Sequence, residues 1–230
     1  MVKNKKNLIK MLAVMSGLSG FIILAYVFFP LISYDINSKK FTSYLSPIPD
    51  EKVFVQQSYD NTKASNWFPD GAPSVDFSTS NVGYYNISIP KLKIDAAVVS
   101  IGGEDLSKSL IQYPGTALPG KDGNAVIFGH SILPQFYNPK DYLAMFSMLP
   151  TLETGDDISV SYDGVIYKYK VDNKVEVSPT DLQVLEQDVS DSFLTLVTCV
   201  PPGHPLMPRR LIIRARLVPF GGQANAAIRG

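Results

Sequence analysis

Residues 11–34 contain no charged side chain, and this apolar run constrains the fold of the chain more than any other feature. As a helix rising 1.5 Å per residue it extends about 36 Å, enough to cross the roughly 30 Å hydrocarbon core of a bilayer. Four lysines precede the run, and Asp35 is the first charge after it. The positive-inside rule then predicts that residues 1–10 are a basic cytoplasmic terminus, residues 11–34 a transmembrane anchor, and the rest extracytoplasmic.

A cleaved signal peptide is the alternative interpretation of the same run. The run is longer than the apolar core of about 7–15 residues that signal peptides carry, and no Ala-x-Ala cleavage site follows it. A retained, single-pass anchor is therefore the preferred interpretation.

Composition limits what the rest of the chain does. With 230 residues, the chain has room for one domain of ordinary size. Its 21 basic and 21 acidic residues give no charge imbalance of the kind that indicates nucleic-acid binding. Cys199 is the single cysteine, so neither an internal disulfide nor a cysteine-based zinc cluster can form. Because a lone thiol outside the membrane is exposed to oxidation, its presence there calls for a functional explanation.

The polar stretch after the anchor predicts a linker or stalk over residues 35–82, since it is rich in proline and lacks a sustained period. An aromatic cluster, Trp-Phe-Pro-Asp-Gly at residues 67–71, lies within it. A local turn is the simpler interpretation of this cluster, and a lid folded back over the domain is the alternative. Residues 83–220 are the folded domain, and residues 221–230 a polar tail.

Strand patterns dominate the folded domain. The clearest is a β-hairpin formed by residues 158–162 and 165–177 around an Asp-Gly turn. In its second arm, alternation predicts a solvated face that carries Lys168, Lys170, Asp172, Lys174 and Glu176. Further strands are expected at residues 85–89, 95–101, 125–128, 193–199 and 210–218, short helices at 106–111 and 142–149, and a capped helical turn ending at Leu185. About eight short strands predict a mainly β fold, a closed β-barrel with short helices behind one transmembrane helix.

Candidate catalytic residues stand at the ends of the predicted strands. A cysteine nucleophile needs a base, and of the two histidines His130 follows a buried strand while His204 lies in a proline-rich loop. Arginine at the start of the last strand has the fixed charge that stabilises an oxyanion. Strand parity does not choose between Arg209 and Arg210. Cysteine, histidine and arginine are thus expected to meet at one rim of the barrel.

Three motifs in order resemble the sortase family, the membrane-anchored cysteine transpeptidases of bacterial cell surfaces. They are Phe-Gly-His at residues 128–130, Thr-Leu-Val-Thr-Cys at 195–199, and Arg-Leu-Ile-Ile-Arg-Ala at 210–215. The resemblance extends over residues 84–218. It implies an eight-stranded sortase-like β-barrel.

The resemblance also implies a reaction. The enzyme would cleave an LPxTG-like sorting motif between Thr and Gly, forming a thioester on Cys199, and pass the acyl group to an amine of a cell-wall precursor or a pilin lysine. His130 would be the acid and base, and Arg210 the arginine, with Arg209 as the second choice. Thr198 would help to position the substrate or the oxyanion. The implied partners are surface proteins with a C-terminal sorting signal, a peptidoglycan precursor or pilin as acceptor, and membrane lipid, with no nucleic acid.

Several alternatives stay open on the sequence. A cysteine hydrolase would use the same residues with water as acceptor, and a membrane-tethered β-barrel binding module would use none of them. No cofactor or metal is expected, because the carboxylates available for calcium, which activates some sortases, are interpreted as solvated loop charges. These carboxylates are Glu176, Asp181, Glu186 and Asp188. The sortase subclass, the sorting motif, the acceptor, the role of His204 and the oligomeric state are not determined.

Overall fold

The computed structural model describes residues 2–38, 62–67 and 83–219. The chain divides into two compact units, Met1–Lys40 and Phe41–Gly230. Each unit is described by itself.

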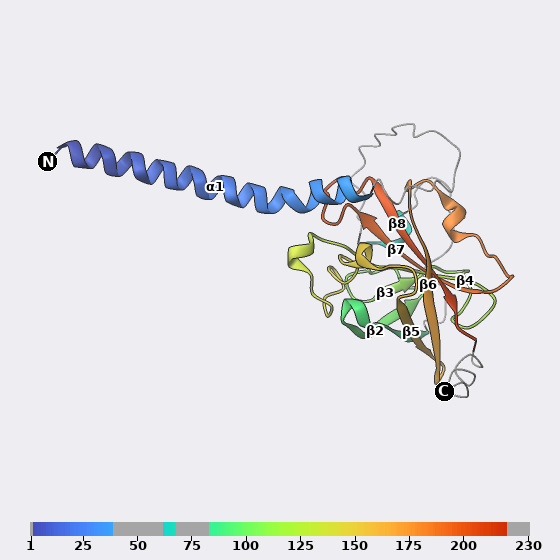
Figure 1. Ribbon diagram of the computed structural model, residues 1–230. Helices are drawn as coiled ribbons and strands as arrows, with labels where there is room; N and C mark the ends of the chain where they lie inside the picture. The colour runs from blue at the N-terminus through green and yellow to red at the C-terminus, as the bar shows by residue number, and fades with distance from the viewer. Residues whose placement is uncertain (1, 39–61, 68–82, 220–230) are drawn as a thin grey trace, which may run out of the picture. The chain divides into compact units, whose positions relative to one another are not determined.

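The first unit consists of helix α1 (Val2–Ser38), shown in blue in Figure 1. Within α1, Lys10–Ile36 is long and apolar enough to cross a membrane, a test that a signal sequence near the N-terminus also passes. The predicted apolar helix is therefore confirmed, while its crossing of a membrane stays a prediction.

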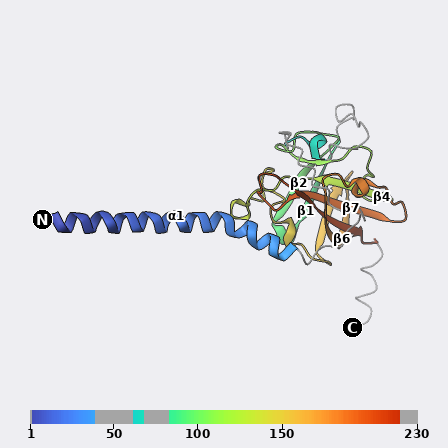
Figure 2. The ribbon, with the colours of Figure 1, turned by 90° about the horizontal axis from the view of Figure 1, so that it is seen from above.

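The second unit is built around a closed barrel of eight strands, as predicted (Figures 1 and 2). Around the barrel the strands follow the order β1-β2-β3-β4-β7-β8-β6-β5. The pairs β2–β3 and β4–β7 are parallel, and the other six are antiparallel. The strands are β1 (Tyr84–Ile89), β2 (Ile94–Ile101), β3 (Leu110–Gln112), β4 (Gly123–Phe128), β5 (Asp157–Tyr162), β6 (Val165–Val177), β7 (Ser192–Val200) and β8 (Arg209–Leu217).

The predicted hairpin is confirmed as β5 and β6. Asp163 and Gly164 between them have φ angles of 50° and 74°, as a type I′ turn requires. The prediction of a solvated face on β6 is wrong near the C-terminal end of the strand. A bulge between Val171 and Asn173 shifts the alternation, and Glu176 is buried, 8% exposed.

The two predicted short helices are wrong. Residues 106–109 form a turn into β3, because Leu110–Gln112 pairs with β2 and β4, and so short a stretch gains too little from helical bonds to compete. Residues 142–148 form successive turns, followed by a 3-10 helix, η4 (Leu149–Thr151). The amide of Phe146 donates to the carbonyl of His130, at 2.9 Å, so it cannot make the helical bond. The expected helical turn is present as η5 (Leu182–Leu185), where Asp181 accepts from the amide of Gln183, at 3.1 Å.

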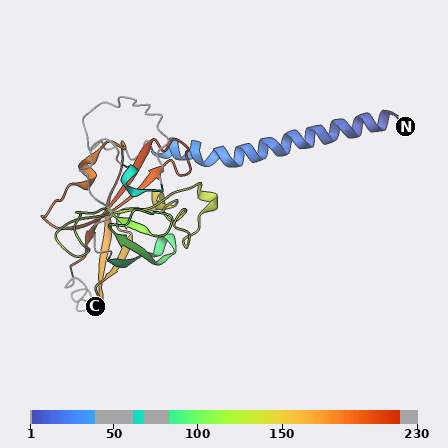
Figure 3. The same cartoon turned by 180° about the vertical axis from the view of Figure 1, so that it is seen from behind.

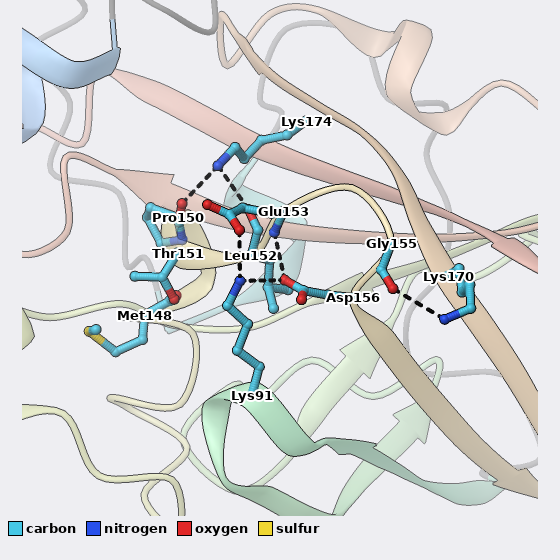
Figure 4. Close-up of polar contacts among 10 residues, drawn as sticks. All are labelled: Lys91, Met148, Pro150, Thr151, Leu152, Glu153, Gly155, Asp156, Lys170 and Lys174. Carbon is cyan, nitrogen blue, oxygen red and sulfur yellow. Dashed lines mark hydrogen bonds and ion pairs between the residues drawn. The ribbon is translucent and has the colours of Figure 1, made fainter.

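A network of charges holds the segment before β5 (Figure 4). The Lys91 ammonium lies 3.3 Å from Glu153 and 2.8 Å from Asp156. Lys174 donates to the carbonyls of Pro150 and Leu152, at 2.9 and 2.8 Å, and burial lowers the pKa of its ammonium. These contacts join β6 to the segment that leads into β5.

Gly129 allows close packing between the end of β4 and the side chains of Phe146 and Leu110. A Cβ there would lie 2.5 Å from Phe146 Cδ2 and 2.6 Å from Leu110 Cδ2. We expect Gly129→Ala to lower the free energy of unfolding by about 1–3 kcal/mol, because neither side chain has room to move in the core. Urea denaturation followed by circular dichroism measures this. Gly83→Ala is the control, since its Cβ would lie 3.3 Å from the flexible Ile101 Cδ1; equal losses in the two variants would contradict this packing argument.

Candidate active site

The parallel pairing of β4 and β7 brings His130 beside Cys199. The register pairs Phe128 with Val197, and two further residues on each strand lead to His130 and Cys199. The strands stay in step beyond the pairing, since the Gly129 amide donates to the Val197 carbonyl at 3.1 Å. The Ser131 hydroxyl donates to the Cys199 carbonyl at 2.6 Å. The predicted cysteine and histidine therefore lie together at one end of the barrel.

Arg210 stands directly opposite Cys199 on the next strand. The two residues are Cα partners in the antiparallel β7–β8 pair, so their side chains share a face. Arg210 is buried, and it donates from Nη1 to the Met207 carbonyl, at 2.9 Å, and from Nη2 to the Trp67 carbonyl, at 3.1 Å. Its Nε has no hydrogen-bond partner among the described residues. One donor of the guanidinium thus remains available beside the thiol.

Arg209 points away from this face. As the neighbour of Arg210 on β8 it alternates to the other side of the sheet, where Nη1 lies 3.1 Å from Oε2 of the buried Glu176. The structure therefore separates the two arginines that the sequence left as alternatives, and it brings Arg210 to the cysteine.

Thr198, like Arg209, lies on the other side of the sheet from Cys199. It is fully buried, and its hydroxyl donates to the Gly129 carbonyl at 2.8 Å. The side chain therefore holds β7 to the residue that precedes His130, and does not lie on the face shared by Cys199 and Arg210.

Trp67 covers the face that Cys199 and Arg210 share. The sequence did not decide between a local turn and such a cover for this residue. Trp67 belongs to the 3-10 helix η1 (Ala64–Trp67), coloured cyan beside β7 and β8 in Figures 1 and 3. Its ring is fully buried, stacks on Phe128 at 5.4 Å between centroids, and lies 5.8 Å from the His130 ring and 5.4 Å from the Arg210 guanidinium carbon. Residues 68–71 of the aromatic cluster lie outside the described residues.

Cys199 and Trp67 belong to one apolar cluster on the outer side of the sheet. Strands β3, β4, β6, β7 and β8 supply residues to it, and η1, η5, Leu106 and Tyr113 complete it. Its buried members are Ala64, Trp67, Leu106, Ile111, Tyr113, Val126, Phe128, Val175, Val177, Val184, Val197, Cys199 and Ile212. We call this set the outer-face cluster.

Burial controls the protonation of the Cys199 thiol. Cys199 is 3% exposed, and this burial raises the pKa of its thiol, while the charge of Arg210 acts in the opposite direction. The desolvation effect is the larger. With Trp67 in place the thiol is therefore held in its neutral, less nucleophilic form.

The other candidate residues have structural contacts. His204 accepts through Nδ1 from the Leu206 amide, at 3.2 Å, within its own loop. Of the carboxylates considered for calcium, Glu176 pairs with Arg209 and Asp181 caps η5. Within the described ranges, no group of three or more histidine, cysteine, aspartate or glutamate side chains is arranged to hold a metal ion.

Sequence reasoning missed the contact between Arg210 and the main chain of Trp67. The available signal was the chain's single tryptophan, placed in a polar linker where an aromatic ring has no other apolar surface. Its docking site is on strands more than sixty residues away in the sequence, which no local pattern identifies.

The barrel thus brings a cysteine, a histidine and an arginine together, an arrangement that a cysteine enzyme can use. The model of the sortase domain matches residues 87–218, more than half of the chain. The chain therefore belongs to the sortase family.

Solved sortase structures from several bacteria are similar to the chain. A sortase D5 transpeptidase from Clostridium perfringens is 27% identical over 60% of this chain and 79% of that chain, with a TM-score of 0.50. A lid mutant of sortase A from Corynebacterium diphtheriae is 28% identical over 64% and 76%, with a TM-score of 0.52. Sortase C-1 from Streptococcus pneumoniae is 28% identical over 59% and 67%, with a TM-score of 0.51. No curated protein matches the sequence.

Removing the Trp67 ring should activate the thiol. We expect Trp67→Ala to speed alkylation of Cys199 by iodoacetamide at pH 7.5 by about tenfold, because water that reaches the sulfur lowers the pKa of the thiol and increases the thiolate fraction. Mass spectrometry of the alkylated chain measures the rate. The pH at which the rate reaches half of its maximum should be lower for Trp67→Ala than for the unchanged protein.

Ile166→Ala serves as the control, since Ile166 is an exposed apolar residue on the β5–β6 hairpin. Alkylation of this variant should match that of the unchanged protein. Equal rates in Trp67→Ala and the unchanged protein would show that Trp67 does not limit access to the thiol.

Proposed function

We propose that this sortase cleaves an LPxTG-like sorting motif between Thr and Gly through a thioester on Cys199, and transfers the acyl group to an amine. The observation that carries the proposal is the register of three adjacent strands, which aligns His130, Cys199 and Arg210. The same face of the sheet already binds a peptide segment of the chain, η1, through its main-chain carbonyl.

In the first half of the reaction, the Cys199 thiolate attacks the carbonyl carbon of the motif's Thr. A C–S bond forms, and the carbonyl electron pair moves to the oxygen. When the tetrahedral adduct collapses, the Thr–Gly C–N bond breaks and His130 gives a proton to the leaving amine. The motif then remains on Cys199 as a thioester.

In the second half, the acceptor amine attacks the thioester carbon. A new C–N bond forms, the C–S bond breaks to return the thiolate, and His130 takes the proton that the amine loses. Water in place of the amine would give hydrolysis, so the acceptor decides between the two outcomes.

Arg210 stabilises the oxyanion of both tetrahedral adducts. Its Nη2 lies 3.1 Å from a peptide carbonyl oxygen, the Trp67 carbonyl, which is within the range for an oxyanion donor. Burial strengthens the interaction because water does not screen the charge. Thr198 and Ser131 act as positioning residues, since their hydroxyls join the strand of Cys199 to the segment that carries His130.

The cell surface is the proposed location. Helix α1 would anchor the enzyme in the membrane with the N-terminus in the cytoplasm, following the lysines that precede the apolar run. The catalytic domain would then meet surface proteins that carry a C-terminal sorting signal, together with an acceptor amine on a peptidoglycan precursor or a pilin. Trp67 would act as a lid that leaves before a substrate enters.

The test is to incubate the full chain in detergent with a Leu-Pro-Glu-Thr-Gly peptide, with and without triglycine. We expect a mass increase on Cys199 equal to the acyl fragment, and ligated product only with triglycine. Cys199→Ala should give neither. Cleavage without amine-dependent product would favour the hydrolase, and no adduct on a folded protein would contradict the proposal.

The two histidines provide a matched pair for the same assay. His130→Ala should abolish turnover, because His130 is the base that the strand register aligns with the thiol, while His204→Ala should retain most of it. Equal losses would overturn the assignment of His130.

The adjacent arginines test the oxyanion role. Arg210→Lys should lower kcat by about 10²- to 10³-fold, the usual effect of removing one oxyanion donor. Arg209→Lys should change kcat little, because Arg209 pairs with Glu176 on the other face. Steady-state rates with the same peptide measure both, and the prediction fails if Arg209→Lys is the more damaged variant.

A further inference from the structure

The segment that ends at Trp67 is bound to the domain by main-chain hydrogen bonds. The Ala64 amide donates to the Glu104 carbonyl at 3.1 Å, and the Leu106 amide donates to the Thr62 carbonyl at 2.9 Å. Together they form an antiparallel bridge between Lys63 and Asp105. The segment is therefore held at two points, at residues 104–106 upstream and at Arg210 downstream.

Residues 104–106, the edge with which the segment pairs, also make contacts of their own. The Asp105 carboxylate accepts from the amide and hydroxyl of Ser107, at 3.0 and 2.5 Å, and pairs with Lys108 at 2.9 Å. The hydroxyl of Ser107 is the largest cause that lowers the pKa of Asp105 to about 2. Leu106 is fully buried in the outer-face cluster. The contacts of Asp105 with Ser107 and Lys108 do not involve residues 62–67, so they can persist when the segment leaves.

The downstream contact marks where a scissile carbonyl would lie. In the proposed reaction Arg210 holds the carbonyl oxygen of the residue before the scissile bond, and in the structure it holds that of Trp67. A donor peptide that follows the same path, including the 3-10 turn of η1 over its last four residues, has its fourth residue before the bond where Ala64 lies. Its sixth residue then lies where Thr62 lies, against Leu106.

We infer that residues 104–106 are a binding site for the main chain of the donor peptide upstream of its sorting motif, formed by antiparallel pairing. The inference rests on the proposed function. The site takes any sequence at the fourth to sixth residues before the scissile bond, because both hydrogen bonds are made by main-chain groups of the ligand. The fourth residue before the scissile bond donates its amide to Glu104, and the sixth accepts from Leu106 through its carbonyl.

Backbone-modified peptides test the site without altering the protein. The reference is acetyl-Thr-Lys-Leu-Pro-Glu-Thr-Gly, used with the full-length Trp67→Ala variant in detergent so that the segment does not compete fully. N-methylation of Leu, the fourth residue, should lower kcat/KM by about five- to tenfold, as expected for a lost main-chain hydrogen bond. Replacing the Thr-Lys amide by an ester, which weakens the sixth residue's carbonyl as an acceptor, should lower it by a smaller factor.

N-methylation of Lys, the fifth residue, is the matched control. In the bridge both bonds belong to the neighbours of Lys63, so the fifth residue's own amide points away from the edge. This peptide should react like the reference. If all four peptides react with equal kcat/KM, the binding site is wrong while the proposed function stands; if none is cleaved, the proposed function itself fails.

A binding measurement separates the two outcomes further. In Cys199→Ala no thioester can form, and Trp67, the single tryptophan, reports displacement of the segment through its fluorescence. The reference peptide should shift the emission at lower concentration than the Leu-methylated peptide does. Identical titration curves for the two peptides would overturn the inference.

Discussion

The parallel pairing of β4 with β7 is the constraint on which the rest of the site depends. Parallel strands run in the same direction, so their last residues meet at the same end of the sheet, and Phe128 opposite Val197 leads to His130 beside Cys199. The antiparallel neighbour β8 begins at that end, which brings its first buried residue, Arg210, opposite the cysteine. Three residues far apart in the sequence therefore meet through backbone hydrogen bonds, and a shift of one residue in either pair would turn a functional side chain to the other face.

The same strand arrangement places the thiol on a face whose burial stabilises the fold but opposes formation of the thiolate. Cys199 and Arg210 lie on an apolar outer face, and an uncovered apolar face on a barrel is unfavourable in water. Trp67 covers this face with its ring and accepts a hydrogen bond from the guanidinium with its carbonyl. The cover stabilises the folded state, but it also desolvates the thiol and opposes thiolate formation. In the proposed reaction, a ligand would have to replace the contacts of the cover while bringing an electrophile to the sulfur.

The sequence predicted features that depend on local interactions better than features that depend on long-range contacts. Strong alternation and the Asp-Gly turn are local, and the β5–β6 hairpin was predicted correctly. The two short helices were wrong because long-range bonds override weak local preferences: Phe146 bonds to His130, and Leu110–Gln112 pairs with β2. Glu176 was expected in solvent because a bulge in β6 leaves no sequence signal. The motifs that carry Cys199, His130 and Arg210 were recognised as motifs, while their geometry came from the register.

η1 is held by its main-chain groups as well as by the Trp67 ring, and in the proposed function the same protein groups would bind the main chain of a substrate. Arg210 and residues 104–106 bind carbonyls and amides that every peptide has, so neither contact distinguishes Trp67 and its neighbours from a foreign segment. Discrimination must come from side chains and from covalent connection. The chain's own segment has the advantage of high local concentration, which a free peptide lacks. In the proposed function, a substrate would have to gain affinity from its side chains, and the fixed sequence of a sorting motif would supply that difference where the main chain cannot.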